Sequence, residues 1–407
     1  MTTFIKIAWR NILRSKKRSL ITISAVGFGL GALIFIWSFV EGSHKQMIEN
    51  YTSYVTAQVQ VQKKGYQATQ KLENYLEHPQ EIIRKVKTNP NVIAVSPRIR
   101  GEALMSSADS SVGVMVLGIN PAAEKQVSVL HKRLKKGKYL STDDTQIVLG
   151  AGLAKNLNVD LGDKVVLMGQ ALDGSIAGGA YHVAGLIETG AEEIDKGLVL
   201  ITRKAAEDLF VMNGKVSQIA IKLNDVKNSD RTAAELTTLL HNPQLEILPW
   251  RKVSPILQQW LEYDATFVWI IVMIVMVVVA IGILNTVLMG VLERTREFGI
   301  LQAIGTKGGQ IILMVTWESI FLGSIGTVGG FLLGIGLTGF FGQKGIDLSL
   351  FTNALNAFYM ESIIYPTINW QAVWISVGLV LVTSFVASFY PAWYASRLEP
   401  VEAIRSL

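Results

Sequence analysis

Four long apolar runs with almost no charge are the feature of this sequence that most constrains its fold. The hydrocarbon core of a bilayer is about 30 Å thick, and a helix needs about 20 apolar residues to cross it. Three of the runs hold no charged residue, and the remaining one holds only Glu318. A buried core helix is rarely this long, so four such runs predict four transmembrane helices. The predicted spans are 19–40, 265–292, 308–341 and 371–394.

Composition agrees with a membrane protein. Charged residues make up 17% of the chain, against about 25% in soluble globular proteins, and the deficit is concentrated in the four runs. The chain has no cysteine, which excludes a disulfide framework, a thiolate metal site and a cysteine nucleophile.

The distribution of basic residues predicts the orientation. Segment 1–18 holds six cations and no acid, while 293–307 and the tail 395–407 are also rich in basic residues. Lys and Arg concentrate on the cytoplasmic side of membrane proteins, so both termini and 293–307 are predicted to be cytoplasmic. Segment 41–264 is nearly neutral, and the net charge of +6 is explained by anionic lipid without nucleic acid.

The chain is therefore predicted to be an α-helical membrane protein with a large α+β extracytoplasmic domain inserted after the first span. Residues 1–18 suit a cytoplasmic amphipathic helix, and the first span is expected to continue outward as a stalk to about Tyr54. The predicted extracytoplasmic segments are 41–264 and the loop 342–370, and the cytoplasmic ones also include 293–307 and 395–407.

Two βαβ-like units plus a β-rich subdomain are expected within 41–264. The first unit begins with the alternating segment 58–62, which is typical of a half-buried strand. The second has the same order of strand, helix, Asn-Pro and strand, and the stretch between the units is rich in strands and turns. Its loop 170–180 is interpreted as an ordinary hairpin loop, with a protruding docking loop as the alternative. The predicted elements are 58–62, 81–87, 92–99, 218–223, 232–240 and 245–248.

No motif for covalent chemistry occurs. A G-x-x-x-x-G-K-[ST] phosphate loop, a dinucleotide fingerprint, H-E-x-x-H and G-x-S-x-G are all absent, and the five histidines have no metal-ligand spacing. We expect no catalytic residue, metal or cofactor in this chain. Energy for any driven work must come from a partner.

The most informative segment is 293–305, a helix-competent stretch with charges first and apolar residues after. Such a helix, joined rigidly to two spans, can pass a push from a soluble partner into the membrane. The equally weighted alternative is a charged connecting helix that only fixes topology. Gly305 suits the end of the helix. The candidate coupling residues are Glu293, Arg294, Arg296, Glu297, Phe298, Gly299 and Gly305.

The third span carries two further features. An ionised Glu318 facing lipid would cost about 2.5–3.5 kcal/mol, so we expect it to face the bundle or an opening to water, as a packing partner rather than a substrate contact. Gly326, Gly330 and Gly334 allow close helix approach, and a static interface is favoured over a sliding one. The first span, which holds glycines 27, 29 and 31, is expected to line a dimer seam with the second span.

Three sets of residues resemble one protein family. Segment 293–305 resembles the coupling helix of the MacB/FtsX-like permeases of ABC transporters, and 390–405 resembles their C-terminal Y-P-A pattern. Segments 147–154 and 161–165 resemble the external domain of the lipoprotein-releasing (LolC/LolE-like) branch. One span, a large external domain and three more spans is also that family's layout.

The resemblance implies a permease of the bacterial inner membrane that works with two copies of a separate ABC ATPase, which binds ATP and Mg²⁺. It also implies a second permease copy or a paralogue, contacts with membrane lipids and lipoprotein or lipid-linked cargo. A periplasmic acceptor is less expected, because the 170–180 loop is short and glycine-rich where the docking hook of the branch would lie. Two alternatives stay open: a MacB-like exporter of a periplasmic substrate, and an FtsX-like regulator of an external cell-wall hydrolase.

Overall fold

The computed structural model describes residues 10, 12 and 14–399, which form two compact units. The helical unit consists of the chain up to His44, Leu261–Asp347 and the chain from Ile363 onward. The sheet unit consists of Lys45–Trp260 and Leu348–Ser362. Most of the predicted amphipathic helix 1–18 and the end of the tail 395–407 lie outside the described residues.

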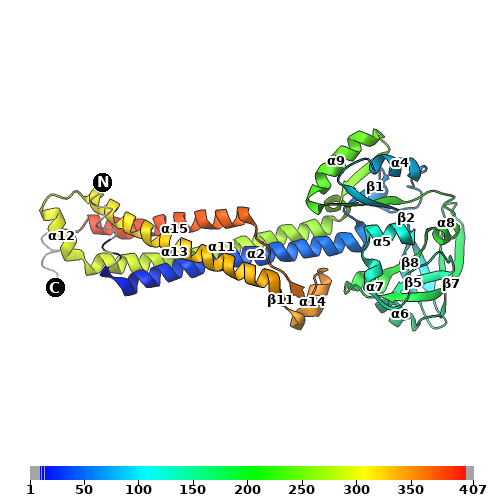
Figure 1. Ribbon diagram of the computed structural model, residues 1–407, viewed down its shortest axis with the longest axis horizontal. Coiled ribbons are helices and arrows are strands. Elements are labelled where there is room, and N and C mark those ends of the chain that lie inside the picture. The colour runs from blue at the N-terminus through cyan, green and yellow to red at the C-terminus, as the bar shows by residue number, and fades with distance from the viewer. Residues whose placement is uncertain (1–9, 11, 13, 400–407) are drawn as a thin grey trace. The chain divides into compact units, whose positions relative to one another are not determined.

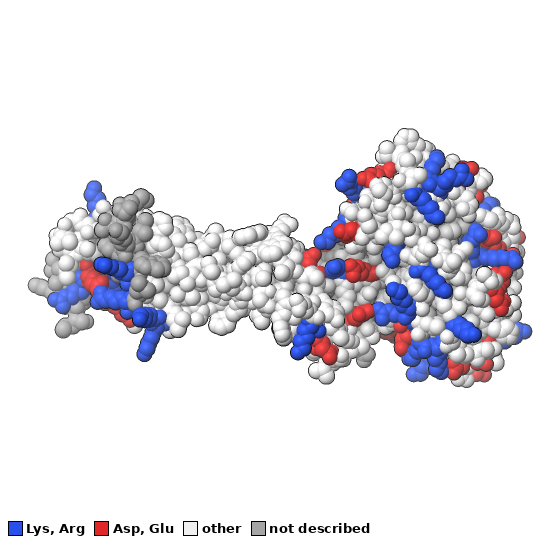
Figure 2. All heavy atoms as spheres, viewed as in Figure 1, with Lys and Arg blue, Asp and Glu red and all other residues white. Residues whose placement is uncertain are grey.

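Four long helices build the helical unit (Figure 1), and each is long and apolar enough to cross a membrane. In Figure 2 their flanks carry almost no coloured side chains, and charge gathers near the end that holds the short helix α12. The first of them continues past Val40 to Tyr51 and then into a π-helical turn, η1 (Thr52–Thr56), as expected of a stalk. The four long helices are α2 (Lys16–Tyr51), α11 (Pro255–Glu293), α13 (Gly308–Lys344) and α15 (Trp370–Ser396), and the short helix is α12 (Thr295–Ala303).

Glycines allow α2 and α13 to touch backbone to backbone. A Cβ atom on Gly330 would lie 2.5 Å from the carbonyl oxygen of Gly27, and one on Gly334 would lie 2.8 Å from Cβ of Ile34. Gly326 has an equally close neighbour in Val26. Small residues in membrane helices permit such approach, where dispersion and not the hydrophobic effect holds helices together.

The glycines of the first span face two helices of the same chain. Gly27 and Gly31 face α13, and a Cβ on Gly29 would lie 2.5 Å from Val279 of α11. All three are therefore covered inside the chain, and a dimer seam along the first and second spans stays a prediction.

Aromatic and polar residues mark the ends of the helices far from α12. The Trp37 and Trp269 rings meet edge to face at 5.7 Å. Just beyond them, the side chain of Asn369 donates to Glu41 over 3.0 Å, and His44 lies 2.6 Å from Asp264. At a membrane–water interface, tryptophan rings usually lie at the level of the lipid headgroups, and charged side chains lie farther out in water.

Ten strands of the sheet unit form one sheet, with the order β10-β1-β9-β2-β3-β8-β5-β7-β4 and β6 paired with β2 and β7. The strands are β1 (Val59–Lys63), β2 (Val92–Ser106), β3 (Ser111–Ile119), β4 (Leu134–Gly137), β5 (Gln146–Gly150), β6 (Lys164–Gln170), β7 (Ile176–Ile187), β8 (Leu198–Thr202), β9 (Gln218–Leu223) and β10 (Leu245–Pro249). The helical segments are α3 (Tyr66–Thr69), α4 (Pro79–Val86), α5 (Pro121–Val127), η2 (Leu130–Arg133), α6 (Ala151–Leu157), α7 (Glu192–Gly197), α8 (Arg203–Phe210), η3 (Val226–Asn228), α9 (Ser229–Leu240) and α10 (Trp250–Val253). The loop between α13 and α15 adds β11 (Ile346–Asp347), η4 (Ser349–Phe351), α14 (Thr352–Ala357) and β12 (Ile363–Ile364).

The two predicted βαβ units, β1-α4-β2 and β9-α9-β10, interleave. Strand β9 lies between β1 and β2, and β1 lies between β9 and β10, all antiparallel to their neighbours. This is the split βαβ arrangement, with the intervening strands inserted between its halves.

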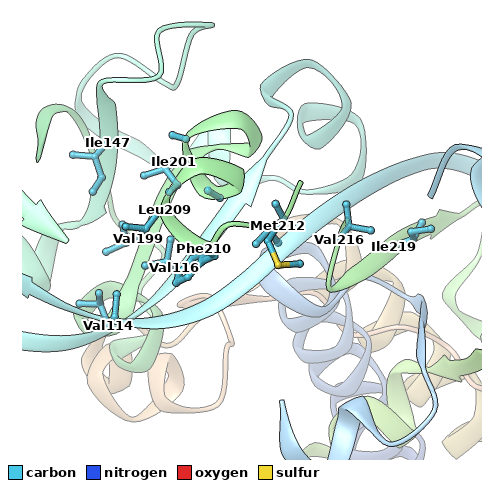
Figure 3. Close-up of a cluster of buried hydrophobic side chains, with 14 of the residues drawn as sticks. Val114, Val116, Ile147, Val199, Ile201, Leu209, Phe210, Met212, Val216 and Ile219 are labelled. Carbon is cyan, nitrogen blue, oxygen red and sulfur yellow. The ribbon is translucent and has the colours of Figure 1, made fainter. Parts of the chain in front are cut away.

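The β-rich stretch belongs to the same sheet as the two βαβ units. The first half of β2 pairs with β9 and its second half pairs with β3, so one 15-residue strand carries the sheet from the split βαβ part into the inserted part. One apolar core follows it, in which Leu209 and Phe210 of α8 pack against Val116 and Val199 (Figure 3).

Strand β1 is buried on both faces and not half-buried as predicted. Val59 and Val61 lie in the main core, while Gln60 and Gln62 are only 3% and 0% exposed. The amide of Gln60 donates to the carbonyl of Thr56, and that of Gln62 donates to Gln60. The alternation of Val and Gln predicted one exposed face, but the Gln side chains are buried because their amide groups find hydrogen-bond partners inside the protein.

A buried ion pair fastens α5 to β2. Arg98 and Glu124 are both fully buried and 2.6 Å apart, and Ser96 donates to the same carboxylate over 2.8 Å. Burial alone would raise the pKa of Glu124, but the adjacent Arg98 guanidinium and the hydroxyl donors lower it.

The predicted loop 170–180 is a tight hairpin turn. Strand β6 ends at Gln170 and β7 begins at Ile176, with Gly174 at φ +84° between them. Gly178 and Gly179 belong to β7. The expected hairpin is therefore present, and the alternative that this segment docks a partner stays a prediction.

Replacing Gly330 by Leu should separate α2 from α13, because its side chain has to displace the Gly27 backbone. Overpacking of this kind costs about 1–3 kcal/mol. The neighbouring Gly329 has nothing within 4 Å of a built Cβ, so Gly329→Leu is the matched control. Thermal unfolding of the detergent-purified protein should show a lower midpoint for Gly330→Leu only. Equal midpoints for both variants would contradict the packing role.

Candidate functional site: the coupling helix and its ion-pair cluster

Helix α12 is anchored by Phe298. This side chain is 1% exposed and belongs to an apolar cluster with Val291 of α11, Val315 of α13 and Ala392 of α15. The amide of Gln302 also donates to the carbonyl of Ala395 over 3.3 Å. Contacts to three long helices leave α12 little freedom to move independently of them.

Ion pairs join the α11–α12 junction to the beginning of α2 and to α13. The guanidinium of Arg18 lies 2.9 Å from Glu293 and 3.5 Å from Glu318. The guanidinium of Arg294 lies 3.2 Å from Glu318 and 2.8 Å from Glu297. Arg14 completes the set, 2.9 Å from Glu297. We call these six side chains the ion-pair cluster.

The centre of the ion-pair cluster is shielded from solvent and its rim is not. The side chains of Arg18, Arg294 and Glu318 are 18%, 16% and 13% exposed, whereas those of Arg14 and Glu293 are 76% and 53% exposed. Exposed pairs contribute little on their own. The central Arg18–Glu318–Arg294 triad therefore carries most of the electrostatic interaction.

Gly290 makes room for Arg18 on α11. A Cβ atom on Gly290 would lie 2.7 Å from the guanidinium carbon of Arg18. The sequence analysis used Arg14 and Arg18 only for topology and did not single out Gly290. A glycine among large apolar residues, one turn before the Glu293-Arg294 pair, was the available signal.

Glu318 lies inside the helical unit between two arginines. Arg18 and Arg294 lie beside it, and the same three side chains line a small pocket. Two cations compensate the carboxylate, which explains how an acid is accommodated in an otherwise apolar helix.

The carboxyl of Glu297 lies on the rim, outside the spanning helices. Partial burial alone would raise its pKa, but hydrogen bonds and attraction from Arg294 and Arg14 outweigh that effect and lower the pKa. Glu297 therefore stays ionised, and remains able to bind both arginines, at neutral pH.

One face of α12 is left uncovered. Arg296 and Ala303 are exposed, and Ile300 and Ile304 are 46% and 75% exposed. Positions 296, 300 and 304 are four apart and so lie on one face of the helix. Leu301 packs with the Phe298 cluster, and Gly299 is buried.

Gly305 ends α12 as predicted. Its φ is +98°, its N–H donates to Gln302, and the N–H of Thr306 donates to Leu301. This is the Schellman arrangement, in which glycine occupies the left-handed position after the helix.

Among the described residues, no group of three or more acidic, His or Cys side chains could hold a metal ion.

Two family matches cover most of the chain. Residues 19–239 match the MacB-like periplasmic core domain, and residues 269–400 match the FtsX-like permease C-terminal domain. The chain belongs to the MacB-like periplasmic core domain family. Its second match identifies it as a permease, and that match includes α12, Glu318 and the glycines of α13.

Curated relatives of this family match along nearly the whole chain. The lipoprotein-releasing system transmembrane protein LolC of Neisseria meningitidis is 25% identical over 98% of both chains. LolE of Haemophilus influenzae, also a lipoprotein-releasing system transmembrane protein, is 22% identical over 100% of both. The macrolide export ATP-binding/permease protein MacB of Hyphomonas neptunium is 24% identical over 99% of this chain but only 60% of its own.

Replacing Glu318 by Leu should destabilise the helical unit by about 3 kcal/mol, because two shielded arginines lose their counter-charge. Glu318→Gln keeps hydrogen bonding and should cost less. Thermal unfolding of the purified protein measures both variants.

The matched control removes the whole triad, as Arg18→Met, Arg294→Met and Glu318→Leu together. Replacing every member of a buried ionic set by apolar residues is often neutral, so this variant should unfold at a higher temperature than Glu318→Leu alone. A triple variant no more stable than the single one would show that Glu318 acts through other groups.

Proposed function

We propose that this permease couples ATP hydrolysis on a separate ABC ATPase to release of lipoproteins or lipid-linked cargo from the outer leaflet of a bacterial inner membrane. The observation that carries the proposal is the arrangement of α12: one face is exposed, and Arg294, directly before the helix, shares Glu318 with Arg18 of α2. Displacement of α12 by a partner would therefore displace α2.

A separate ATPase is supported by the relatives named as transmembrane proteins of a lipoprotein-releasing system, which match this chain over 98–100% of their own length. Two ATPase copies would serve two permease chains, either identical or paralogous. ATP and Mg²⁺ would bind the ATPase.

The orientation follows from charge. Arg14, Arg18, Arg294 and Arg296 gather at the α12 end of the helical unit, and basic residues favour the cytoplasmic side. We propose that both termini and α12 are cytoplasmic and that 41–264 is periplasmic. The ATPase would then meet α12 directly.

Lipoprotein cargo is favoured by the relatives named as lipoprotein-releasing proteins, which match this chain over their full length. The MacB-like alternative, export of a periplasmic substrate, is favoured by the family match over 19–239. No observation of the structure favours the FtsX-like regulator of a cell-wall hydrolase.

Charged residues on the exposed face of α12 should abolish ATPase binding. In the double variant Ile300→Asp, Ile304→Asp, a partner that covers this face would bury two carboxylates without a counter-charge. We therefore expect the affinity for the ATPase to fall at least tenfold, which is about 1.4 kcal/mol or more. The measurement is the amount of ATPase that co-purifies with the chain in mild detergent. Ile176→Asp, at an 86% exposed residue of β7, is the control. Unchanged co-purification of the double variant would contradict α12 as the ATPase contact.

Depletion of the permease distinguishes the two cargo hypotheses. If the cargo is lipoprotein, outer-membrane lipoproteins should accumulate in the inner-membrane fraction of the envelope. Normal lipoprotein sorting, together with loss of export of another substrate, would favour the MacB-like function instead.

A further inference from the structure

The loop between α13 and α15 contains an uncharged segment with two different faces. No charged residue occurs between Asp347 and Glu361, and η4 and α14 form two short consecutive helices within it. In a loop that leaves a membrane, thirteen residues without charge are unusual, because exposed loops are normally rich in polar groups.

One face of the segment is bound to the sheet unit. The hydroxyl of Tyr359 donates to Glu193 over 3.0 Å, and its carbonyl accepts from Asn50 over 2.9 Å. Glu361 forms an ion pair with Arg133, and Leu355 is 8% exposed. These contacts fix the orientation of the segment on the sheet unit.

The other face is apolar and uncovered. Leu350 is 96% exposed and Phe351 61%, and Ala354 and Ala357 are exposed as well. Phe358, at the end of this face, is 36% exposed and its ring meets that of Trp260 edge to face at 5.2 Å. The positions 350, 351, 354, 357 and 358 follow helical spacing. Two large apolar side chains at the start of this face have no partner that would keep them from water.

The chain itself places this face near the membrane boundary. Leu350 lies three residues after Asp347, so it is within about 11 Å of the β11–β12 hairpin. Strand β12 pairs with β11 and leads into Tyr365, Trp370 and Trp374, which are 45%, 54% and 62% exposed. Exposed tyrosine and tryptophan at a helix start mark the interfacial region of a bilayer.

We propose that the apolar face of residues 350–358 lies in the outer interfacial region of the bilayer, with Leu350 and Phe351 inserted among the lipids. Amphipathic segments bind bilayers in this manner, with the apolar face buried at the headgroup–acyl boundary. Since the opposite face holds the sheet unit through Tyr359 and Glu361, the segment links that unit to the lipid surface. The inference rests on the membrane spans and is independent of the cargo.

The absence of cysteine makes a direct test possible. Leu350→Cys and Phe351→Cys, each labelled with the fluorophore NBD, are reconstituted as full-length protein in phosphatidylethanolamine–phosphatidylglycerol vesicles. Ile176→Cys, at another highly exposed apolar side chain (86%), is the control. Emission is quenched in parallel by lipids with a shallow nitroxide and by aqueous iodide.

We expect the lipid nitroxide to quench labels at 350 and 351 at least about threefold more than the label at 176, and iodide to do the reverse. Iodide quenching at 350 and 351 equal to that at 176 would overturn the proposal. Protection from both quenchers would also overturn it, because a second protein copy would then cover the face. Since each label replaces an exposed side chain, a folding defect is not expected to confuse the outcome.

Discussion

Hydrocarbon cannot solvate charge, and the helical unit depends on this constraint. Its charged side chains lie at the ends of the long helices, and at the α12 end Arg18 and Arg294 enclose Glu318. Each of the three would be costly alone, and together they compensate one another. Because the three come from α2, the α11–α12 junction and α13, the pairing that makes them tolerable also joins those helices.

Two kinds of contact therefore hold α2 in place. Near α12 the contact is electrostatic, through Arg18 in the space left by Gly290. Farther along, it is backbone packing at Gly27 and Gly31 against α13. Helix α2 is continuous from Lys16 to Tyr51, and its residues from Lys45 onward belong to the sheet unit. A displacement of the beginning of α2 can therefore be passed along this helix to the sheet unit.

Local features of this protein were predictable from sequence, and long-range ones were not. The spans follow from apolar length, the stalk from helical continuation past Val40, and the end of α12 from Gly305, all of which depend on neighbouring residues. The interleaving of β1 with β9 and β10, the buried Gln60 and Gln62, and the partners of Glu318 depend on residues distant in the chain. Hydrophobic periodicity carries no information on which strands or charges meet, so these features required the structure.

The central claim is that the ion-pair cluster transmits movement of α12 to α2. The most direct test measures the amount of cargo released per ATP hydrolysed by the reconstituted complex. The Arg18→Gln variant is compared with the wild type. The account predicts that ATP hydrolysis continues while release per ATP falls by about tenfold or more, the consequence of losing about 1.4 kcal/mol or more of coupling. An unchanged ratio in a variant that remains folded would contradict it.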